Sequence, residues 1–203
     1  AAGRMGAGLV STATRREHAA LSSAVHPEVM SHGVEAPSDL SPLLERATVI
    51  AIGPGLGRDA WGQQMLGRVL ETEKLLVMDA DALNALSDEP VRRGKWVLTP
   101  HPGEAGRLLK SGAGAVQANR FEAVQEIQRR FGGAVVLKGS GTLVADENGD
   151  LAVCNAGNPG MASGGMGDLL TGVVAGLLAQ GLGLAEAARV GVCLHATAGD
   201  RAA

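Results

Sequence analysis

The alternation of short apolar runs with longer amphipathic stretches is the feature that most constrains the fold of this sequence. The runs are mainly aliphatic, which is typical of strands buried on both faces of a sheet. They comprise residues 48–52, 75–78, 96–99 and 134–137. The stretches 61–73 and 116–131 have the 3.6-residue period of helices that pack on a sheet. Because right-handed crossovers connect parallel strands, the alternation predicts a mostly parallel α/β sheet covered by helices.

Shorter segments complete the predicted fold. The turn sequence 146–150 separates two apolar runs, and this pattern predicts an antiparallel hairpin of residues 143–145 and 151–154 at one edge of the sheet. A short buried strand is expected at 9–13, after the tail of a small-residue helix, and an irregular connection at 25–38. Further helices are expected at 17–24, 40–47, 169–180 and 184–199.

Two predictions concern individual side chains of these helices. The period of the stretch 116–131 predicts that Phe121, Val124, Ile127 and Phe131 face the core. His195 stands among alanines in the last helix, and we interpret it as a packed structural residue.

Composition limits the classes of function. A formal net charge of −3 argues against a general nucleic-acid surface, and two Trp, two Phe and no Tyr leave no platform for stacked bases. No apolar run approaches the ~20 residues of a membrane span, and the N-terminus lacks the apolar core of a signal peptide. The two cysteines suggest neither a disulfide framework nor a metal site. We expect reduced thiols and a cytoplasmic location, with no membrane partner.

The length of 203 residues suits one domain, and no linker divides the chain. The small-residue segment 1–8 enters its strand abruptly, which usually happens after an earlier strand. We therefore expect residues 1–203 to be a single domain that begins mid-fold.

Five polar or glycine-rich loops are expected at one rim of the sheet. Each follows a predicted strand or precedes a predicted helix; they are 53–57, 79–84, 100–104, 138–142 and 164–168. The carboxyl ends of parallel strands share one edge, and ligands of open α/β sheets bind there. The convergence of five loops predicts a ligand site more strongly than any single motif does.

The stretch 158–168 has the pattern of an anion site. Gly164, Gly165 and Gly167 let the backbone turn tightly, and the helix that follows directs free N–H groups and its positive dipole end toward the loop. Asp168 stands beside this cradle, where a carboxylate would repel a phosphate unless it accepts a proton from a reacting hydroxyl. The alternative is that Asp168 merely caps its helix.

The other loops carry weaker signals. Residues 138–142, Lys-Gly-Ser-Gly-Thr, combine a cation, two hydroxyls and free backbone donors, although the order of a Walker loop is absent. The G-x-G-x-G of residues 53–57 is equally compatible with a simple tight turn. His101 is held between two prolines, and we weigh a ligand contact evenly against a surface role. No spacing of His, Cys, Asp or Glu predicts a metal site built from protein ligands alone.

Taken in order along the chain, these motifs resemble the ADP- or ATP-dependent NAD(P)H-hydrate dehydratases. The resemblance covers Gly-Pro-Gly-Leu-Gly at 53–57, Asp-Ala-Asp-Ala-Leu-Asn at 79–84, Leu-Thr-Pro-His-Pro-Gly-Glu at 98–104, Lys-Gly-Ser-Gly-Thr at 138–142 and the stretch 158–168. It implies a ribokinase-like three-layer αβα sandwich. It also implies that upstream and downstream segments of the family's domain are missing here.

The resemblance further implies a reaction and a set of roles. A nucleotide, ADP or ATP with Mg²⁺, phosphorylates the hydroxyl of hydrated NADH or NADPH (NADHX, NADPHX); phosphate is then eliminated and the reduced cofactor is restored. Asp168 is implied as the catalytic base, and Gly164, Gly165, Met166 and Gly167 as the anion hole. Lys138, Gly139, Ser140, Gly141, Thr142 and Gly167 are implied to bind the nucleotide. The implied dinucleotide-binding residues are Gly53, Gly55, Gly57, Asp79, Asp81, Asn84, His101, Glu104, Asn158 and Asp168.

The resemblance also implies a homo-oligomer, a tetramer, and a fused or partner epimerase domain. Two other functions stay open from the sequence. One is a small-molecule kinase of the same fold, which would leave a stable phosphoester as product. The other is a nucleotide-binding module without catalysis. The sequence does not choose between ADP and ATP, or between NADHX and NADPHX.

Overall fold

The computed structural model describes residues 1–203 and places six strands in one sheet. They are β3 (Val49–Ile52), β4 (Leu75–Met78), β5 (Trp96–Leu98), β6 (Ala134–Leu137), β7 (Thr142–Ala145) and β8 (Leu151–Cys154), adjacent in that order. Neighbours from β3 to β6 pair in parallel, whereas β6, β7 and β8 pair antiparallel. The mostly parallel sheet with a hairpin at one edge is thus confirmed.

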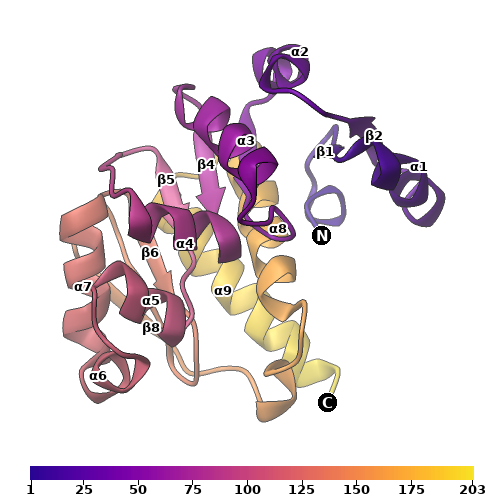
Figure 1. The fold of residues 1–203 in the computed structure, drawn as a ribbon. Coiled ribbons are helices and arrows are strands. Elements are labelled where there is room, and N and C mark those ends of the chain that lie inside the picture. The colour runs from indigo at the N-terminus through magenta and orange to yellow at the C-terminus, as the bar shows by residue number, and fades with distance from the viewer.

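Helices cover both faces of this sheet (Figure 1). One layer contains α3 (Ala60–Leu70), α4 (Ala80–Asp88), α5 (Pro102–Leu108), α6 (Ala113–Ala118) and α7 (Arg120–Phe131). The opposite layer contains α8 (Met166–Ala179) and α9 (Leu184–Arg201). Successive strand residues belong to different cores: Leu76 and Met78 pack with the first layer, and Val77 packs with α8 and α9. This alternation is the reason that the strands read as continuous apolar runs.

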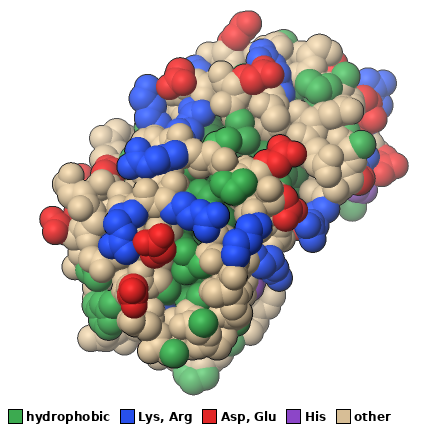
Figure 2. Space-filling view, turned by 60° about the vertical axis from the view of Figure 1, so that its left-hand side comes forward, with side chains coloured by type: hydrophobic (Ala, Val, Ile, Leu, Met, Phe, Trp, Pro, Cys, Tyr) green, Lys and Arg blue, Asp and Glu red, His purple; other side chains and the backbone are tan.

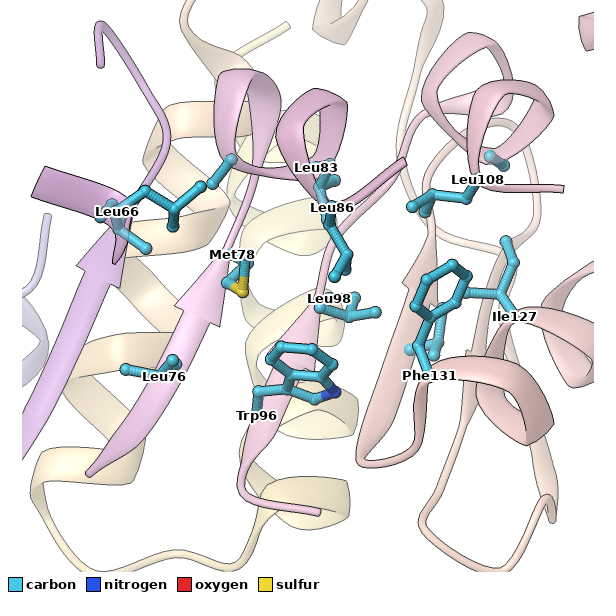
Figure 3. Packing of buried hydrophobic residues seen from close by; sticks show 14 of the residues in the cluster. Leu66, Leu76, Met78, Leu83, Leu86, Trp96, Leu98, Leu108, Ile127 and Phe131 are labelled. Atoms are coloured by element: carbon cyan, nitrogen blue, oxygen red, sulfur yellow. The ribbon is translucent and has the colours of Figure 1, made fainter. Parts of the chain in front are cut away.

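Trp96 and Phe131 are the largest fully buried side chains of the first core (Figure 3). Trp96 also donates a hydrogen bond from its ring nitrogen to the carbonyl of Gly132, at 3.0 Å, so its polar atom is satisfied inside the core. Truncation of such a side chain to alanine typically costs about 3–5 kcal/mol. This core anchors β4 and β5, whose ends carry the loops of interest.

Three sequence predictions about the core are corrected. The stretch 116–131 is not one helix, because Asn119 leaves the helical conformation (φ −144°, ψ 71°), accepts a bond from the Glu122 amide and starts α7 anew. Phe121 is 53% exposed, whereas Ala123 and Val124 of the same turn are buried. The strand at 48–52 is not fully buried, since β3 is an edge strand in which only Ile52 is buried.

The N-terminal segment also differs from the prediction. Residues 1–8 contain only a short 3-10 helix (Gly3–Met5), and the strand β1 spans Ser11–Thr14 with no buried residue. The segment 25–38 is not wholly irregular, because β2 (Met30–Gly33) pairs in parallel with β1. With α1 (Arg16–Val25) these strands form a lobe beside the main sheet (Figure 1). A second 3-10 helix (Pro37–Leu40) and α2 (Ser41–Arg46) lead back to β3.

The surface mixes charges of both signs. On the face shown in Figure 2, Lys and Arg side chains gather in the middle of the view with acidic and hydrophobic side chains among them. None of the helices combines the length and the apolar character that a membrane span requires.

Candidate active site

A cleft of about 450 Å³ lies where the parallel strands end. Asp79 follows β4 directly, His101 and Glu104 come shortly after β5, and Lys138 follows β6. Gly167 and Asp168 in the first turn of α8 form the opposite wall. The structure therefore brings together, in one cleft, residues from four of the five loops that the sequence places at this rim.

Lys138 lies on the floor of the cleft between two buried carboxylates. Its Nζ is 2.6 Å from Oδ1 of Asp79 and 3.8 Å from Oε2 of Glu104, whose side chains are 1% and 6% exposed. The lysine side chain itself is 19% exposed. Two buried negative charges facing one positive charge give this cluster a formal charge of about −1, so the charge of Lys138 is already compensated within the protein.

Asp79 joins several elements at once. Oδ1 also accepts the Ala80 amide at 2.9 Å and so caps α4, and Oδ2 accepts the Thr171 hydroxyl of α8 at 2.8 Å. Its backbone carbonyl abuts Gly53, where an added β-carbon would lie only 1.8 Å from the carbonyl oxygen. Gly53 is thus glycine because the loop after β3 approaches the loop after β4 too closely for a side chain.

His101 caps α5 and lines the cleft. Its Nδ1 accepts the amides of Gly103 (2.9 Å) and Glu104 (3.3 Å), so the ring hydrogen of the neutral imidazole is assigned to Nε2. Nε2 lies 3.4 Å from Oε1 of Glu104, while Oε2 of Glu104 accepts the His101 amide at 2.8 Å. The ring is 49% exposed, which leaves one of its sides open to the cleft.

The first turn of α8 presents free donors. Gly165 precedes the helix with φ of 86°, a conformation that favours glycine, and no side chain caps the helix. The amides of Gly164, Gly165, Gly167 and Asp168 donate to no backbone carbonyl. Unpaired amides at the positive end of a helix dipole are the usual components of a phosphate site.

Asp168 is exposed in that same first turn. The N-cap position of α8 is Gly165 and no side chain accepts a capping hydrogen bond, so the structure does not contain the helix-cap alternative for Asp168. Gly167 lies directly above the ion pair: an added β-carbon would be 3.1 Å from Nζ of Lys138 and 3.5 Å from Oδ2 of Asp79. The anion cradle and the buried charges are therefore in contact through a position that has no side chain.

The loop 138–142 turns through two glycines, Gly139 (φ 139°) and Gly141 (φ 65°), and Thr142 donates to the Gly139 carbonyl at 2.8 Å. Gly139 and Ser140 are exposed. Arg120 in α7 bridges the ends of the loop, since its Nη2 donates to the carbonyls of Leu137 and Gly141, each at 3.2 Å. Burial lowers the pKa of Arg120. A lone arginine in a helix carries no sequence signal for this role, and sequence analysis missed it.

Other predicted site residues lie beside the cleft and not in its lining. Asp81 accepts the Gly57 amide at 3.0 Å, and Asn84 accepts a bond from Arg107 at 2.9 Å. Gly55 is exposed, with no atom near the position of an added β-carbon. These residues flank the floor on the side of β3 and α4.

Asn158 belongs to a separate contact. Its Nδ2 donates to Oδ1 of Asp200 at 3.2 Å, and Oδ2 of Asp200 accepts the Gly157 amide at 2.8 Å. These bonds attach the segment that precedes the cradle to the end of α9, and Met161 of this segment lines the cleft. Asn158 thus fixes the approach to the cradle from outside the cleft.

His195 is half-buried in α9, as expected of a packed residue, but it packs close to the cleft. Burial lowers its pKa and the charge of Lys138 adds to this effect, whereas a hydrogen bond to the Met166 backbone acts in the opposite direction. Its Nε2 is buried without a hydrogen-bond partner. The ring therefore supports the start of α8 in its neutral form.

No three or more His, Cys, Asp or Glu side chains gather closely enough to hold a metal ion. Near the cradle, Asp79 and Glu104 are paired with Lys138, which leaves Asp168 as the exposed carboxylate of the cleft. This donor set fits a divalent cation that arrives on nucleotide phosphates better than one held by the protein.

A family model described as NAD(P)H-hydrate dehydratase matches residues 1–203. The chain belongs to this family. The bifunctional NAD(P)H-hydrate repair enzyme Nnr of Coxiella burnetii is 54% identical over 203 residues, which are 100% of this chain and 42% of that protein. The chain thus spans less than half the length of this curated relative of the dehydratase family.

Solved structures agree with the family and with the predicted fold. A ribokinase-like superfamily protein of Enterococcus faecalis is 35% identical with a TM-score of 0.90, over 99% of this chain and 72% of that one. The ADP/ATP-dependent NAD(P)H-hydrate dehydratase of Bacillus subtilis, co-crystallised with ATP and Mg²⁺ and soaked with CoA, is 32% identical with a TM-score of 0.82, over 97% and 73% of the two chains. The ribokinase-like sandwich predicted for this dehydratase-family chain is confirmed.

Proposed function

We propose that this chain catalyses the ADP- or ATP-dependent dehydration of (S)-NADHX and (S)-NADPHX to NADH and NADPH. The observation that carries the proposal is the exposed carboxylate of Asp168 beside the unpaired amides of the α8 N-terminus. A binding site for a phosphate alone gains nothing from a carboxylate there, whereas a phosphoryl transfer to a hydroxyl needs an acceptor for the proton. The names of the relatives support the same reaction.

Asp168 would take the proton of the ring hydroxyl as that oxygen attacks the terminal phosphorus of the nucleotide. The phosphorus–oxygen bond to the leaving nucleotide breaks, which gives AMP from ADP or ADP from ATP. Elimination then breaks the carbon–oxygen bond to the new phosphate group, and loss of a ring proton restores the reduced nicotinamide. The free amides of Gly165 and Gly167 would hold the phosphoryl oxygens as charge moves.

The two substrates would occupy different sides of the cradle. The loop of Gly139, Ser140, Gly141 and Thr142, in which Gly139 and Ser140 are exposed, offers the nucleotide its backbone donors. On the other side, the open side of His101 and the glycine loop after β3 are proposed to hold the hydrated dinucleotide. The neutral His101 tautomer makes its ring a hydrogen-bond donor through Nε2.

Mg²⁺ is proposed to accompany the nucleotide, where it would shield the phosphate charges that approach Asp168. A cytoplasmic location, a homo-oligomeric state, a single domain at 1–203 and a fused or partner epimerase domain are also proposed. The bifunctional name of the Coxiella relative, of which this chain spans 42%, supports the last of these.

The proposal is tested with Asp168→Asn in a single-turnover assay that follows the absorbance of the reduced nicotinamide, with hydrated NADH and either ADP or ATP. A lost base should lower turnover by roughly 10²–10⁴-fold with little change in nucleotide affinity. Asp88→Asn, at a 61% exposed side chain of a surface ion pair, is the matched control. Near-normal turnover by Asp168→Asn would refute the role, and a stable phosphoester product would identify a kinase instead.

A further inference from the structure

The buried charges beneath the cradle suggest roles that differ from ligand binding. The carboxylate oxygens of Asp79 are both taken, by Lys138 and Ala80 on one side and by Thr171 on the other, and the side chain is 1% exposed. A ligand in the cleft would have to displace a bond within the protein to reach it. We propose that Asp79 and Lys138 are positioning residues, which orient the first turn of α8 and act on the reaction only through Asp168 and the cradle amides.

The connection between Asp79 and Asp168 is short. Thr171 lies three residues after Asp168, so both lie on neighbouring positions of one helix surface, one turn apart. The hydroxyl of Thr171 is held by Asp79 at 2.8 Å inside a 2% exposed side chain, which fixes the rotation of α8 about its axis. A rotation of this helix would redirect the Asp168 carboxylate and every free amide of its first turn together.

Lys138 contributes the second constraint. Its Nζ lies under Gly167, so the lysine supports the helix backbone from below while Asp79 and Glu104 hold the lysine in place. The three groups belong to loops after β4, β5 and β6, and each of these strands is anchored in the core. The orientation of α8 is therefore fixed by contacts to residues at the ends of the core-anchored strands, and not by the exposed loops.

Charge balance separates this role from direct nucleotide binding. With Asp79, Glu104 and Lys138 the cluster carries a formal charge of about −1, and loss of Lys138 alone leaves two uncompensated buried carboxylates. Loss of both Asp79 and Lys138 charges returns the cluster to its original net charge. If Asp79 and Lys138 are positioning residues, the double variant should regain much of the kcat and thermal midpoint that Lys138→Gln loses. If Lys138 is a phosphate ligand, a change of its buried partner cannot restore the lost ADP affinity.

The test is a double-mutant cycle with Asp79→Asn, Lys138→Gln and the combined variant. Thermal midpoints, ADP affinity by calorimetry and kcat for hydrated NADH are measured for each. We expect Lys138→Gln to be the most impaired in midpoint and kcat, and the combined variant to regain about 10-fold in kcat over it. Lys138→Gln with Asp88→Asn, an exposed acid outside the cleft lining, is the matched control and should show no recovery of kcat.

The outcomes distinguish the alternatives. A loss of ADP affinity in Lys138→Gln that persists unchanged in the combined variant would overturn the proposal and assign Lys138 to the nucleotide. Thr171→Val gives an independent readout. Because the Asp168 carboxylate and the cradle amides turn together with α8, kcat and ADP affinity should both fall in this variant, and wild-type values of both would also overturn the proposal.

The role in turnover rests on the proposed dehydratase function, but the midpoints and ADP affinities do not. If the wild-type chain bound ADP without restoring NADH, the proposed function would fail. The cycle would still report whether Asp79 and Lys138 act as a coupled pair.

Discussion

Replacement of Gly53 by alanine tests whether the site floor depends on close contact between two strand-end loops. The added β-carbon would lie 1.8 Å from the Asp79 carbonyl oxygen and 3.1 Å from the Ala82 β-carbon. Because the nearer atom belongs to the backbone, the loop itself must move, and no side-chain rotation relieves the overlap. The φ of Gly53 is 129°, in a region that alanine rarely adopts.

The loss of folding stability expected for Gly53→Ala follows from the positive φ and from the backbone overlap. A non-glycine residue held at such a φ costs about 1–3 kcal/mol, and overpacking costs about 1–3 kcal/mol more. Gly55→Ala is the matched control, since its φ is 67° but no atom lies within 4 Å of the added carbon. The control carries only the conformational cost, which is about 1–2 kcal/mol in the left-handed region.

The assay is urea denaturation of both variants, with the free energy of unfolding obtained by linear extrapolation to zero urea. The two variants are comparable when the free energy of unfolding depends on urea concentration with the same slope. We expect Gly53→Ala to lose at least about 1 kcal/mol more than Gly55→Ala. Equal losses would show that the loops after β3 and β4 can separate without cost. The close-approach argument would then be refuted, and Asp79 would not be held by its neighbour.

Three further predictions address the surroundings of the cradle. Asp200→Ala removes the acceptor of the Gly157 amide. It should lower the free energy of unfolding by about 1 kcal/mol and speed limited proteolysis within 155–165, and unchanged cleavage would contradict the attachment of this segment to α9. Gly199→Ala places a β-carbon 2.4 Å from Sδ of Met161, so its destabilisation should be relieved by adding Met161→Ala, as measured by thermal midpoint. Because burial lowers the pKa of His195 below its ordinary 6.5, the unfolded state binds more protons as the pH falls, and stability drops. His195→Gln should reduce that drop as the pH falls below about 6.5, and parallel stability curves would contradict it.

The sequence was sufficient to predict the strands of the main sheet, because residues such as Leu76, Val77 and Met78 must all be apolar when helices cover both faces. The rim could be predicted for the same reason, since parallel strands end at one edge. The lobe could not. Strand β2, with residues Met-Ser-His-Gly and no buried position, lacks the burial pattern by which a strand is recognised.

The internal contacts of the site were also beyond sequence reasoning. Lys138 and Asp79 are separated by 59 residues, and Thr171 and Asp79 by 92, so only the folded sheet brings them together. The motif of residues 138–142 suggested a free cation, because a lysine in a glycine loop has no visible partner in the sequence. The helix break at Asn119 was missed since the apolar period continues across it, and a single Asn is a weak stop signal.

The charge of the cleft lining limits which groups can attract the phosphates of a nucleotide. Lys138 is the cation in the lining, and it faces Asp79 and Glu104, so together with Asp168 the lining is formally negative. Attraction of phosphate must then come from the unpaired amides and dipole of α8 and from a cation carried by the nucleotide. In this arrangement Asp168 is exposed and has no ion-pair partner, so its carboxylate is free to meet the hydroxyl of a bound substrate. The absence of a free lysine at the cradle is consistent with the proposed role of Asp168 as a base, and the proposed reaction therefore depends on the orientation of α8, which carries both Asp168 and the amides.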